Sequence, residues 1–230
     1  MRNVFTYSAI DQENLLIALL NKAVDTECIS VLYSNLSDKK SDLPKDYINY
    51  DLIAGIGSKA TIRSNSNSFE KLYEFHSAKK DWMFGYLSYD IKNEIEDLSS
   101  DNVDHLDAAN LLFFVPEYVL LLKNDVLEIQ SFATKKECDN FVESFNNDVI
   151  DSQEISLDFK RRDEKEAYLK KIEQIKCHIQ RGDIYEMNYC QEFYAEGVEI
   201  SAEDVFLELN KRMNVPFSSF FKLKDKYILS

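Results

Sequence analysis

Three short apolar runs follow one another closely between residues 111 and 133, and they constrain the fold more than any other feature. They read LLFFVP, YVLLLKN and VLEIQSFA. Each has the length of a strand, and Asn124-Asp125, between the second and third runs, suits a tight hairpin turn. Strands joined by so short a turn run antiparallel. The sequence therefore predicts an antiparallel sheet as the framework of the chain.

The remaining chain alternates irregularly between strand-like and helix-like segments. Asp11 is the expected N-cap of a helix over 12–24, and apolar spacing predicts further helices over 68–79, 135–148 and 201–213. Strand pairs separated by single helices are typical of an α+β fold with mostly antiparallel sheets and packed helices. Further strands are expected over residues 3–9, 28–34, 50–56, 59–64, 82–90, 217–223 and 227–230.

A polar stretch around residues 148–163 is the best candidate for a domain boundary. We place a first domain over residues 1–150 and the start of a second over 151–230. The clearest helix of the sequence follows the boundary. Asp163 and Glu166 are spaced as a capping box, and Gly182 stands where a helix commonly ends. One apolar stripe along this helix comprises Tyr168, Ile172, Ile175 and Ile179.

The composition excludes several classes of protein. With 27 Lys and Arg against 41 Asp and Glu, the net charge is −14, which argues against a nucleic-acid binder. No apolar run approaches the length of a membrane span, and the N-terminus lacks the pattern of a secretory signal. The four cysteines lack zinc-site spacing and indicate free thiols. We expect a soluble, cytoplasmic protein without a membrane-bound or nucleic-acid partner.

The segment GDIYEMNYCQEFY, residues 182–194, combines strand-like alternation with polar side chains on one side. A strand here would place Glu186 and Asn188 on one face, opposite Tyr185, Met187 and other large side chains. Such a face meets either water or a ligand, and the half-buried strand that faces water is the commoner case. The pattern alone leaves both readings open.

Several motifs together resemble those of the chorismate-utilising enzymes, in particular the aminase component of the aminodeoxychorismate synthases. The segment GDIYEMN after a helix and the later segment VPFSSFF are similar to two motifs of that family. WMFGYLSYD, and VLYS followed by YINYDLIAG, resemble two further family elements, in the family order. The resemblance covers most of the chain and implies the N-terminal part of the anthranilate synthase component I-like fold.

The resemblance implies a role for the polar residues of the GDIYEMN motif. Relatives that form isochorismate carry at the position of Glu186 a lysine that acts as general base, and a glutamate reverses that charge. Glu186 is therefore expected near the substrate ring, as a polar wall or a proton carrier, and Asn188 is expected to bind substrate. The resemblance gives Trp82 a structural role, and Glu94 and Glu96 are interpreted as surface charges.

A second set of residues matches positions that enclose a tryptophan in this family. Aromatic rings would pack an indole, and a serine hydroxyl with backbone groups would hold the amino-acid head. Many relatives keep these residues as core without a bound amino acid, so a structural role is the alternative. The set comprises Ser34, Tyr47, Ile48, Asn49, Tyr50, Pro216, Phe217 and Ser218.

The resemblance also implies parts that the 230 residues do not supply. In the family, Mg²⁺ ligands and a Pro-Ile-Lys-Gly-Thr motif follow the position of Ser230, so we expect no metal ligands here and an inactive chain on its own. The expected partners are chorismate, a glutamine amidotransferase subunit that supplies ammonia, and tryptophan. The expected activity is amination of chorismate for p-aminobenzoate and folate synthesis. The alternatives are anthranilate synthase component I and an inactive or tryptophan-binding fragment.

Overall fold

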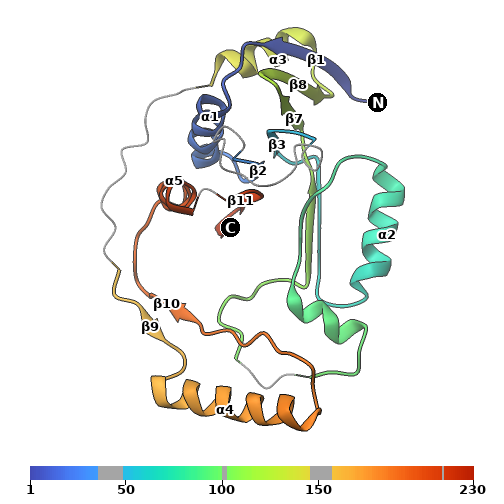
Figure 1. The fold of residues 1–230 in the computed structure, drawn as a ribbon. Coiled ribbons are helices and arrows are strands. Elements are labelled where there is room, and N and C mark those ends of the chain that lie inside the picture. Colours follow the sequence, from blue (N-terminus) through green and yellow to red (C-terminus); the bar gives the residue numbers. More distant parts are fainter. Residues whose placement is uncertain (36–48, 100–102, 146–156, 214) are drawn as a thin grey trace. The chain divides into compact units, whose positions relative to one another are not determined.

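The computed structural model of the chain describes residues 1–35, 49–99, 103–145, 157–213 and 215–230 (Figure 1). These residues form two compact units. The first contains Met1–Ser152 and Ala202–Ser230, and the second contains Gln153–Ser201. None of the helices in the described ranges is long and apolar enough to cross a membrane.

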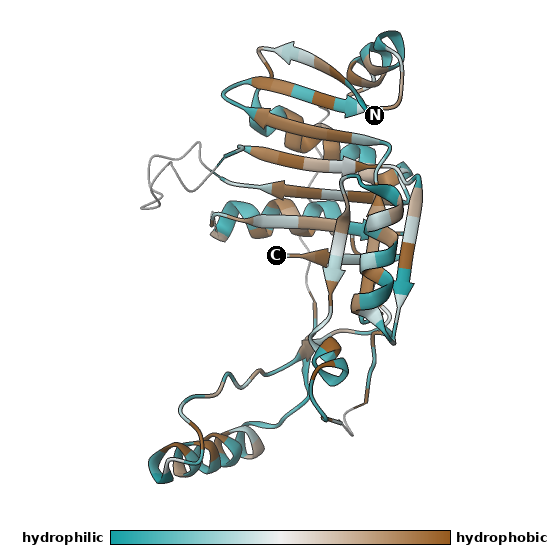
Figure 2. Ribbon diagram, turned by 90° about the vertical axis from the view of Figure 1, so that its right-hand side faces the viewer, coloured by the Kyte–Doolittle hydropathy of each residue, from teal (hydrophilic) through white to brown (hydrophobic). Residues whose placement is uncertain are grey.

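The framework of the first unit is a seven-stranded sheet in the order β1-β8-β7-β3-β2-β11-β12. Figure 2 shows strands of this sheet lying one above another. Each neighbouring pair is antiparallel, which confirms the predicted sheet type. The strands are β1 (Asn3–Ser8), β2 (Cys28–Tyr33), β3 (Leu52–Ile56), β7 (Tyr118–Lys123), β8 (Val126–Ser131), β11 (Ser218–Leu223) and β12 (Lys226–Leu229).

The turn between β7 and β8 confirms the hairpin expected from the sequence. Asn124 and Asp125 have φ angles of 49° and 61°. Two successive residues with positive φ form the turn whose twist matches that of paired strands, and Asn and Asp tolerate this conformation best after Gly.

The two faces of the seven-stranded sheet are covered by different layers. Alternation along β7 sends Leu120 and Leu122 into one core and Val119 and Leu121 into the other. Helices α1, α3 and α5 contribute side chains to the first core, including Leu19, Cys138 and Phe206. The helices are α1 (Gln12–Asp25), α3 (Lys135–Glu143) and α5 (Ala202–Met213).

A three-stranded antiparallel sheet packs on the opposite face. It consists of β4 (Ala60–Ser64), β6 (Leu111–Val115) and β5 (Phe84–Leu87), in that order. The Phe84 ring lies so close to Gly55 of β3 that a Cβ built there would stand 2.6 Å from the ring. Gly55 therefore allows the two sheets to approach each other. Because β3 and β4 belong to different sheets, these consecutive strands do not pair with each other.

The helix-forming segments show how local and distant residues set helix ends. Asp11 caps α1 as predicted, since its side chain accepts a hydrogen bond of 2.9 Å from the Asn14 amide. Helix α2 (Ser68–Lys79) is capped instead by Glu94, at the end of the 3₁₀ helix η2 (Tyr89–Glu94). Glu94 accepts 2.6 Å hydrogen bonds from the Ser68 amide and hydroxyl, so the prediction of a simple surface charge is wrong.

The second unit contains α4 (Lys165–Arg181) and the short strands β9 (Lys160–Arg161) and β10 (Phe193–Tyr194). Gly182 ends α4 in the left-handed conformation, with φ of 82°, as predicted. The predicted capping box is wrong: Glu164 is the N-cap and makes no side-chain cap hydrogen bond. Asp163 instead accepts hydrogen bonds from Lys171 Nζ at 2.8 Å and from the Tyr189 hydroxyl at 2.5 Å.

The compact units differ from the two ranges expected from the sequence. The expected division after residue 150 lies outside the described residues, and residues 202–230 belong to the first unit. The physical reason is strand pairing, because β11 lies beside β2, with Ser218 opposite Tyr33 and Leu223 opposite Cys28. The two domains expected over residues 1–150 and 151–230 stay a prediction.

Candidate functional site

A pocket of about 380 Å³ lies at the end of β2 in the first unit and contains four residues of the predicted tryptophan set. Ser34 and Tyr50 flank β2 and β3 in the sequence, whereas Phe217 comes just before β11. Antiparallel pairing brings these strand ends together, because Tyr33 lies opposite both Leu52 and Ser218. The pocket is lined by Leu32, Tyr33, Ser34, Asn49, Tyr50, Ile53 and Phe217.

Ser34 joins the two strand ends and offers a polar atom to the pocket. Its amide donates to the Asp51 carbonyl at 3.0 Å, and its hydroxyl donates to the Tyr50 carbonyl at 2.8 Å. A hydroxyl that has donated its one proton keeps lone pairs for accepting. Ser34 can therefore receive a hydrogen bond from a ligand ammonium group while it holds Tyr50 in place.

Phe217 supplies an aromatic wall in an unusual backbone conformation. Its φ is 68°, in the left-handed region that bulky residues rarely adopt, and 66% of its surface is exposed. Observed strain of this kind is concentrated at functional sites and ligand clamps. The exposed ring is available to pack against a flat ligand.

Of the other residues in the predicted tryptophan set, the two that the structure describes, Pro216 and Ser218, do not line the pocket. Ser218 is buried, and its hydroxyl donates to the Val215 carbonyl at 3.2 Å. Pro216, two residues before it, is half-buried. Tyr47 and Ile48 lie outside the described residues. The binding role of the whole set stays a prediction.

Asn35 is a structural residue of this site that the sequence prediction missed. It is buried, it has a φ of 53°, and its amide nitrogen lies 2.7 Å from Asn210 Oδ1 and from the Val215 carbonyl. The same nitrogen lies 2.9 Å from Ser218 Oγ, and Asn210 donates back to Asn35 Oδ1 at 3.0 Å. Asn35 thus ties the end of β2 to α5 and to the segment that carries Phe217.

The second predicted site, around Glu186 and Asn188, has a different local structure from the one expected. Residues 184–192 form no strand, and the prediction of a two-faced strand is wrong. A strand needs a partner for its backbone groups, and in the described part of the chain only Phe193 and Tyr194 of this region pair, with β9. Glu186, Asn188 and the large side chains of Tyr185 and Met187 are all exposed.

Contacts with Asp163 hold this segment along α4. Besides Lys171 and the Tyr189 hydroxyl, the Asp163 backbone carbonyl accepts a hydrogen bond of 2.7 Å from Gln191. The hydrogen bonds from Lys171 and Tyr189 lower the pKa of the Asp163 carboxyl below its usual range. The Tyr168 and Tyr189 rings also meet, with centroids 5.4 Å apart. These contacts fix Tyr189 and leave the side chains of Glu186 and Asn188 in solvent.

No divalent-cation site is formed by the residues that the structure describes. Within those ranges, no three His, Cys, Asp or Glu side chains converge closely enough to hold a metal ion. The side chains present here therefore do not fit Mg²⁺, which takes several carboxylate, water or substrate oxygens.

The family described as chorismate binding enzyme matches residues 32–230. The match covers most of the chain and both compact units, so the chain belongs to this family of chorismate-utilising enzymes. The mixed fold of helices and antiparallel sheets agrees with that of a solved family member, described next.

The individual relatives place the chain within the family. It is 35% identical over 78 residues to aminodeoxychorismate synthase component 1 of Escherichia coli K12, a match over 33% of this chain and 17% of that protein. It is 23% identical over 150 residues to the Klebsiella aerogenes protein of the same name, covering 64% of this chain and 33% of that protein. Among solved structures, the menaquinone-specific isochorismate synthase MenF of Escherichia coli has the same fold, with a TM-score of 0.53 and 9% identity over 100% of this chain.

The chain is shorter than these relatives. It spans half of the MenF chain, and the matches to the two curated relatives cover a third of their length or less. At 9% identity, the likeness to MenF concerns the fold alone.

Proposed function

We propose that this chain is the N-terminal part of an aminase that converts chorismate and ammonia to 4-amino-4-deoxychorismate. The observation that carries the proposal is similarity in sequence. The chain matches the chorismate binding family over residues 32–230, and the two named relatives it resembles are both aminodeoxychorismate synthase component 1. Ammonia would come from a glutamine amidotransferase subunit, and the product would enter p-aminobenzoate and folate synthesis.

The proposal assigns the polar segment before β10 to the chorismate site. The exposure of Glu186 and Asn188 supports this, since neither side chain is engaged in the packing of the second unit. A lysine that acts as a base is neutral before it accepts the proton, whereas a glutamate that acts as a base is anionic. Glu186 therefore cannot serve the isochorismate reaction in the same way as the lysine of those relatives. Mg²⁺, held by residues beyond those described here, would neutralise a carboxylate of the substrate.

We further propose that the pocket around Ser34 binds tryptophan. Its volume is within the range of small-molecule sites, and its lining joins the Tyr50 and Phe217 rings to the polar side chains of Ser34 and Asn49. The rings suit an indole, the Ser34 oxygen suits an ammonium group, and the Asn49 amide can donate to a carboxylate.

Calorimetric titration of tryptophan into the chain tests the pocket. We expect saturable binding that is lost in Phe217→Gly, because that change removes the ring while relieving the strained φ. Ser34→Ala is expected to weaken binding about tenfold, through one lost hydrogen bond to a charged group and a freer Tyr50. Tyr73→Ala, an exposed change on α2 outside the pocket, is the control. Absence of binding to the parent chain ends the tryptophan proposal and leaves the aminase proposal untouched.

The aminase proposal is separated from its alternatives by the coding sequence that follows Ser230 in the gene. A Pro-Ile-Lys-Gly-Thr motif there favours amination at C4, whereas alanine in place of its lysine favours anthranilate synthase component I. A second test mixes the 230-residue chain with chorismate, Mg²⁺ and ammonium. We expect no consumption of chorismate, and amination by the chain alone would contradict the proposal that the reactive groups lie outside it.

A further inference from the structure

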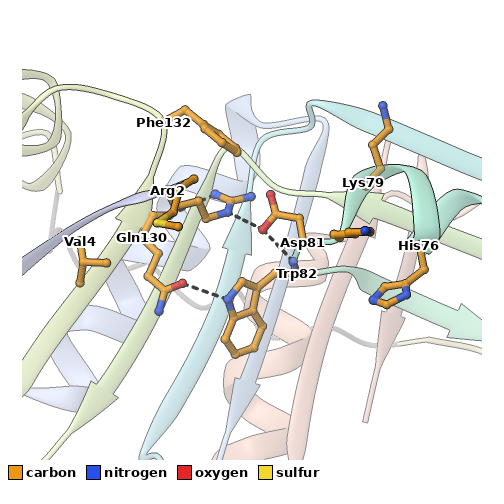
Figure 3. Close-up of a pocket in the computed structure, with 10 residues that line it drawn as sticks. Arg2, Val4, His76, Lys79, Asp81, Trp82, Gln130 and Phe132 are labelled. Carbon is orange, nitrogen blue, oxygen red and sulfur yellow. Dashed lines mark hydrogen bonds and ion pairs between the residues drawn. The ribbon is translucent and has the colours of Figure 1, made fainter.

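A second and larger pocket, of about 750 Å³, lies in the first unit where β1 and β8 meet the C-terminal end of α2. Figure 3 shows Val4 and Gln130 on the two strands, the Trp82 indole beside Gln130, and His76 on the far side of the indole. The lining comprises Met1, Arg2, Val4, His76, Lys79, Lys80, Asp81, Trp82, Gln130 and Phe132.

The inner wall of this pocket is rigidly built. Arg2 Nε pairs with Asp81 at 2.7 Å, and both side chains are largely buried. The other guanidinium nitrogens of Arg2 donate to backbone carbonyls of Pro116, Glu117 and Gln130 at 2.6 to 3.1 Å. The Trp82 indole nitrogen donates to Gln130 Oε1 at 3.0 Å (Figure 3). The polar groups of this wall are therefore satisfied internally, and the ring of Trp82 is held in place.

The surface of this pocket that remains exposed to solvent is partly apolar. Val4 is 54% exposed, Phe132 45% and Trp82 37%. Exposed apolar side chains grouped within one pocket and surrounded by charges are a common mark of an interaction site. Trp is also among the residues that contribute most to binding energy in interfaces.

The rim is cationic, in contrast to the chain as a whole. His76, Lys79 and Lys80 are exposed, and none forms an ion pair with another described residue. Asp81 is already neutralised by Arg2, so the lysines give this pocket a positive charge on a chain of net charge −14. A pocket of this charge selects an acidic ligand.

The pocket also borders a sheet edge. Among the described strands, β1 is outermost in the seven-stranded sheet and pairs only with β8. An open edge offers backbone groups to an added strand, and neighbouring pockets then select the side chains of that strand.

We propose that this surface docks an acidic, extended segment of a partner polypeptide. The segment adds to the free edge of β1, its apolar side chains contact Val4 and Trp82, and its carboxylates meet Lys79 and Lys80. A second copy that paired through its own β1 fits less well, because β1 has the sequence NVFTYS and offers no carboxylate to Lys79 and Lys80.

The experiment uses a fluorescein-labelled peptide of six residues, as long as β1, with the sequence Glu-Thr-Val-Thr-Glu-Thr. One face of this strand carries both glutamate and valine, and the other carries threonine. We expect its anisotropy to rise on titration with the chain, and the rise to shrink at high salt, which screens charges. The unlabelled peptide should change the emission of Trp82, which is the single tryptophan of the sequence. Peptides with lysine for glutamate, or proline for valine, should bind poorly, since the first is repelled by the rim and the second cannot pair with β1.

Charge reversal locates the site. Lys79→Glu with Lys80→Glu is expected to weaken binding at least about tenfold. The matched control, Lys123→Glu with Lys136→Glu, changes the net charge equally at exposed positions outside the pocket and should leave binding intact. Val4→Thr removes the apolar contact and retains strand propensity.

Equal loss in both double variants, or no binding by the parent chain, would overturn the proposal. Binding without any change in Trp82 emission would also overturn it, by placing the peptide elsewhere. A concentration-dependent dimer that Lys79→Glu with Lys80→Glu abolishes would identify a second copy as the occupant instead.

Discussion

Replacement of Asn35 should disturb the first unit more than its position just after the end of β2 indicates. The two hydrogens of its amide nitrogen are shared among Asn210, Val215 and Ser218, and its oxygen accepts from Asn210, so one amide joins β2, α5 and the start of β11. Net contributions are about 0.5–1.5 kcal/mol for each hydrogen bond. Asn210 is half-buried and Val215 exposed, so both can recover bonds to water, whereas Ser218 is buried. We therefore expect Asn35→Gly to cost about 2 kcal/mol of unfolding free energy.

The left-handed backbone adds a separate cost that a second variant measures. Asn35 has a φ of 53°, which glycine adopts freely and alanine does not. Asn35→Ala is therefore expected to be about 1 kcal/mol less stable than Asn35→Gly. Since glycine normally destabilises a chain relative to alanine by loosening the unfolded state, this order of stability is a signature of the positive φ.

Urea unfolding followed by Trp82 fluorescence measures both effects, because the single tryptophan lies in the first unit and the signal reports on that unit. Variants within about 0.5 kcal/mol of the parent chain would refute the reasoning, since changes of that size are typical of plain surface positions. An Asn35→Gly variant less stable than Asn35→Ala would refute the backbone argument alone.

Three further predictions test other contacts of the first unit. Burial raises the folded-state pKa of Glu94, but the hydrogen bonds from Ser68 outweigh it and the net pKa is lowered. The stability that the Glu94 carboxylate provides is therefore complete above about pH 4.5, its usual pKa, and is lost as the pH falls through the lower folded-state pKa. Glu94→Gln should flatten that acid limb in pH-dependent urea melts. Gly55→Ala should cost about 1–3 kcal/mol by pushing on Phe84, and a Phe84→Leu background should recover part of it; equal costs in both backgrounds would contradict the contact. Lys222→Met should cost about 1–3 kcal/mol, because the buried ammonium donates to the last carbonyls of α1, Ala23 and Val24; the exposed control Lys226→Met should change stability little, and a parent-like Lys222→Met melt would argue against this cap.

The features that the sequence predicted well depend on neighbours along the chain. Asn124-Asp125 and the Asp11 cap act within a few residues, and the unbroken apolar run of β7 is typical of a strand covered on both faces. Pairing order is harder to predict, because it depends on contacts between distant strands. Nothing local indicated that β4 leaves β3 for another sheet, or that β11 lies beside β2.

The same distinction explains the results at the candidate sites. Ser34, Asn49, Tyr50 and Phe217 were predicted through the family motifs, and the structure places them around one pocket. Asn35 was missed because its partners lie at least 175 residues away. A buried left-handed asparagine has only a faint signal in the sequence, an Asn directly after a strand.

The strand prediction over residues 184–192 failed for a related reason. Alternation describes how side chains would divide between two faces, but a strand forms only when another strand satisfies its backbone. In the described part of the second unit, Asp163 engages Tyr189 and Gln191 instead. That Glu186 and Asn188 face chorismate stays a prediction.

The most direct test of the proposed function is product analysis with the protein encoded by the whole reading frame that contains this chain. Purified protein would be incubated with chorismate, ammonium and Mg²⁺, and the products separated and identified by mass. We predict 4-amino-4-deoxychorismate. Formation of anthranilate or isochorismate as the main product would contradict the proposed function.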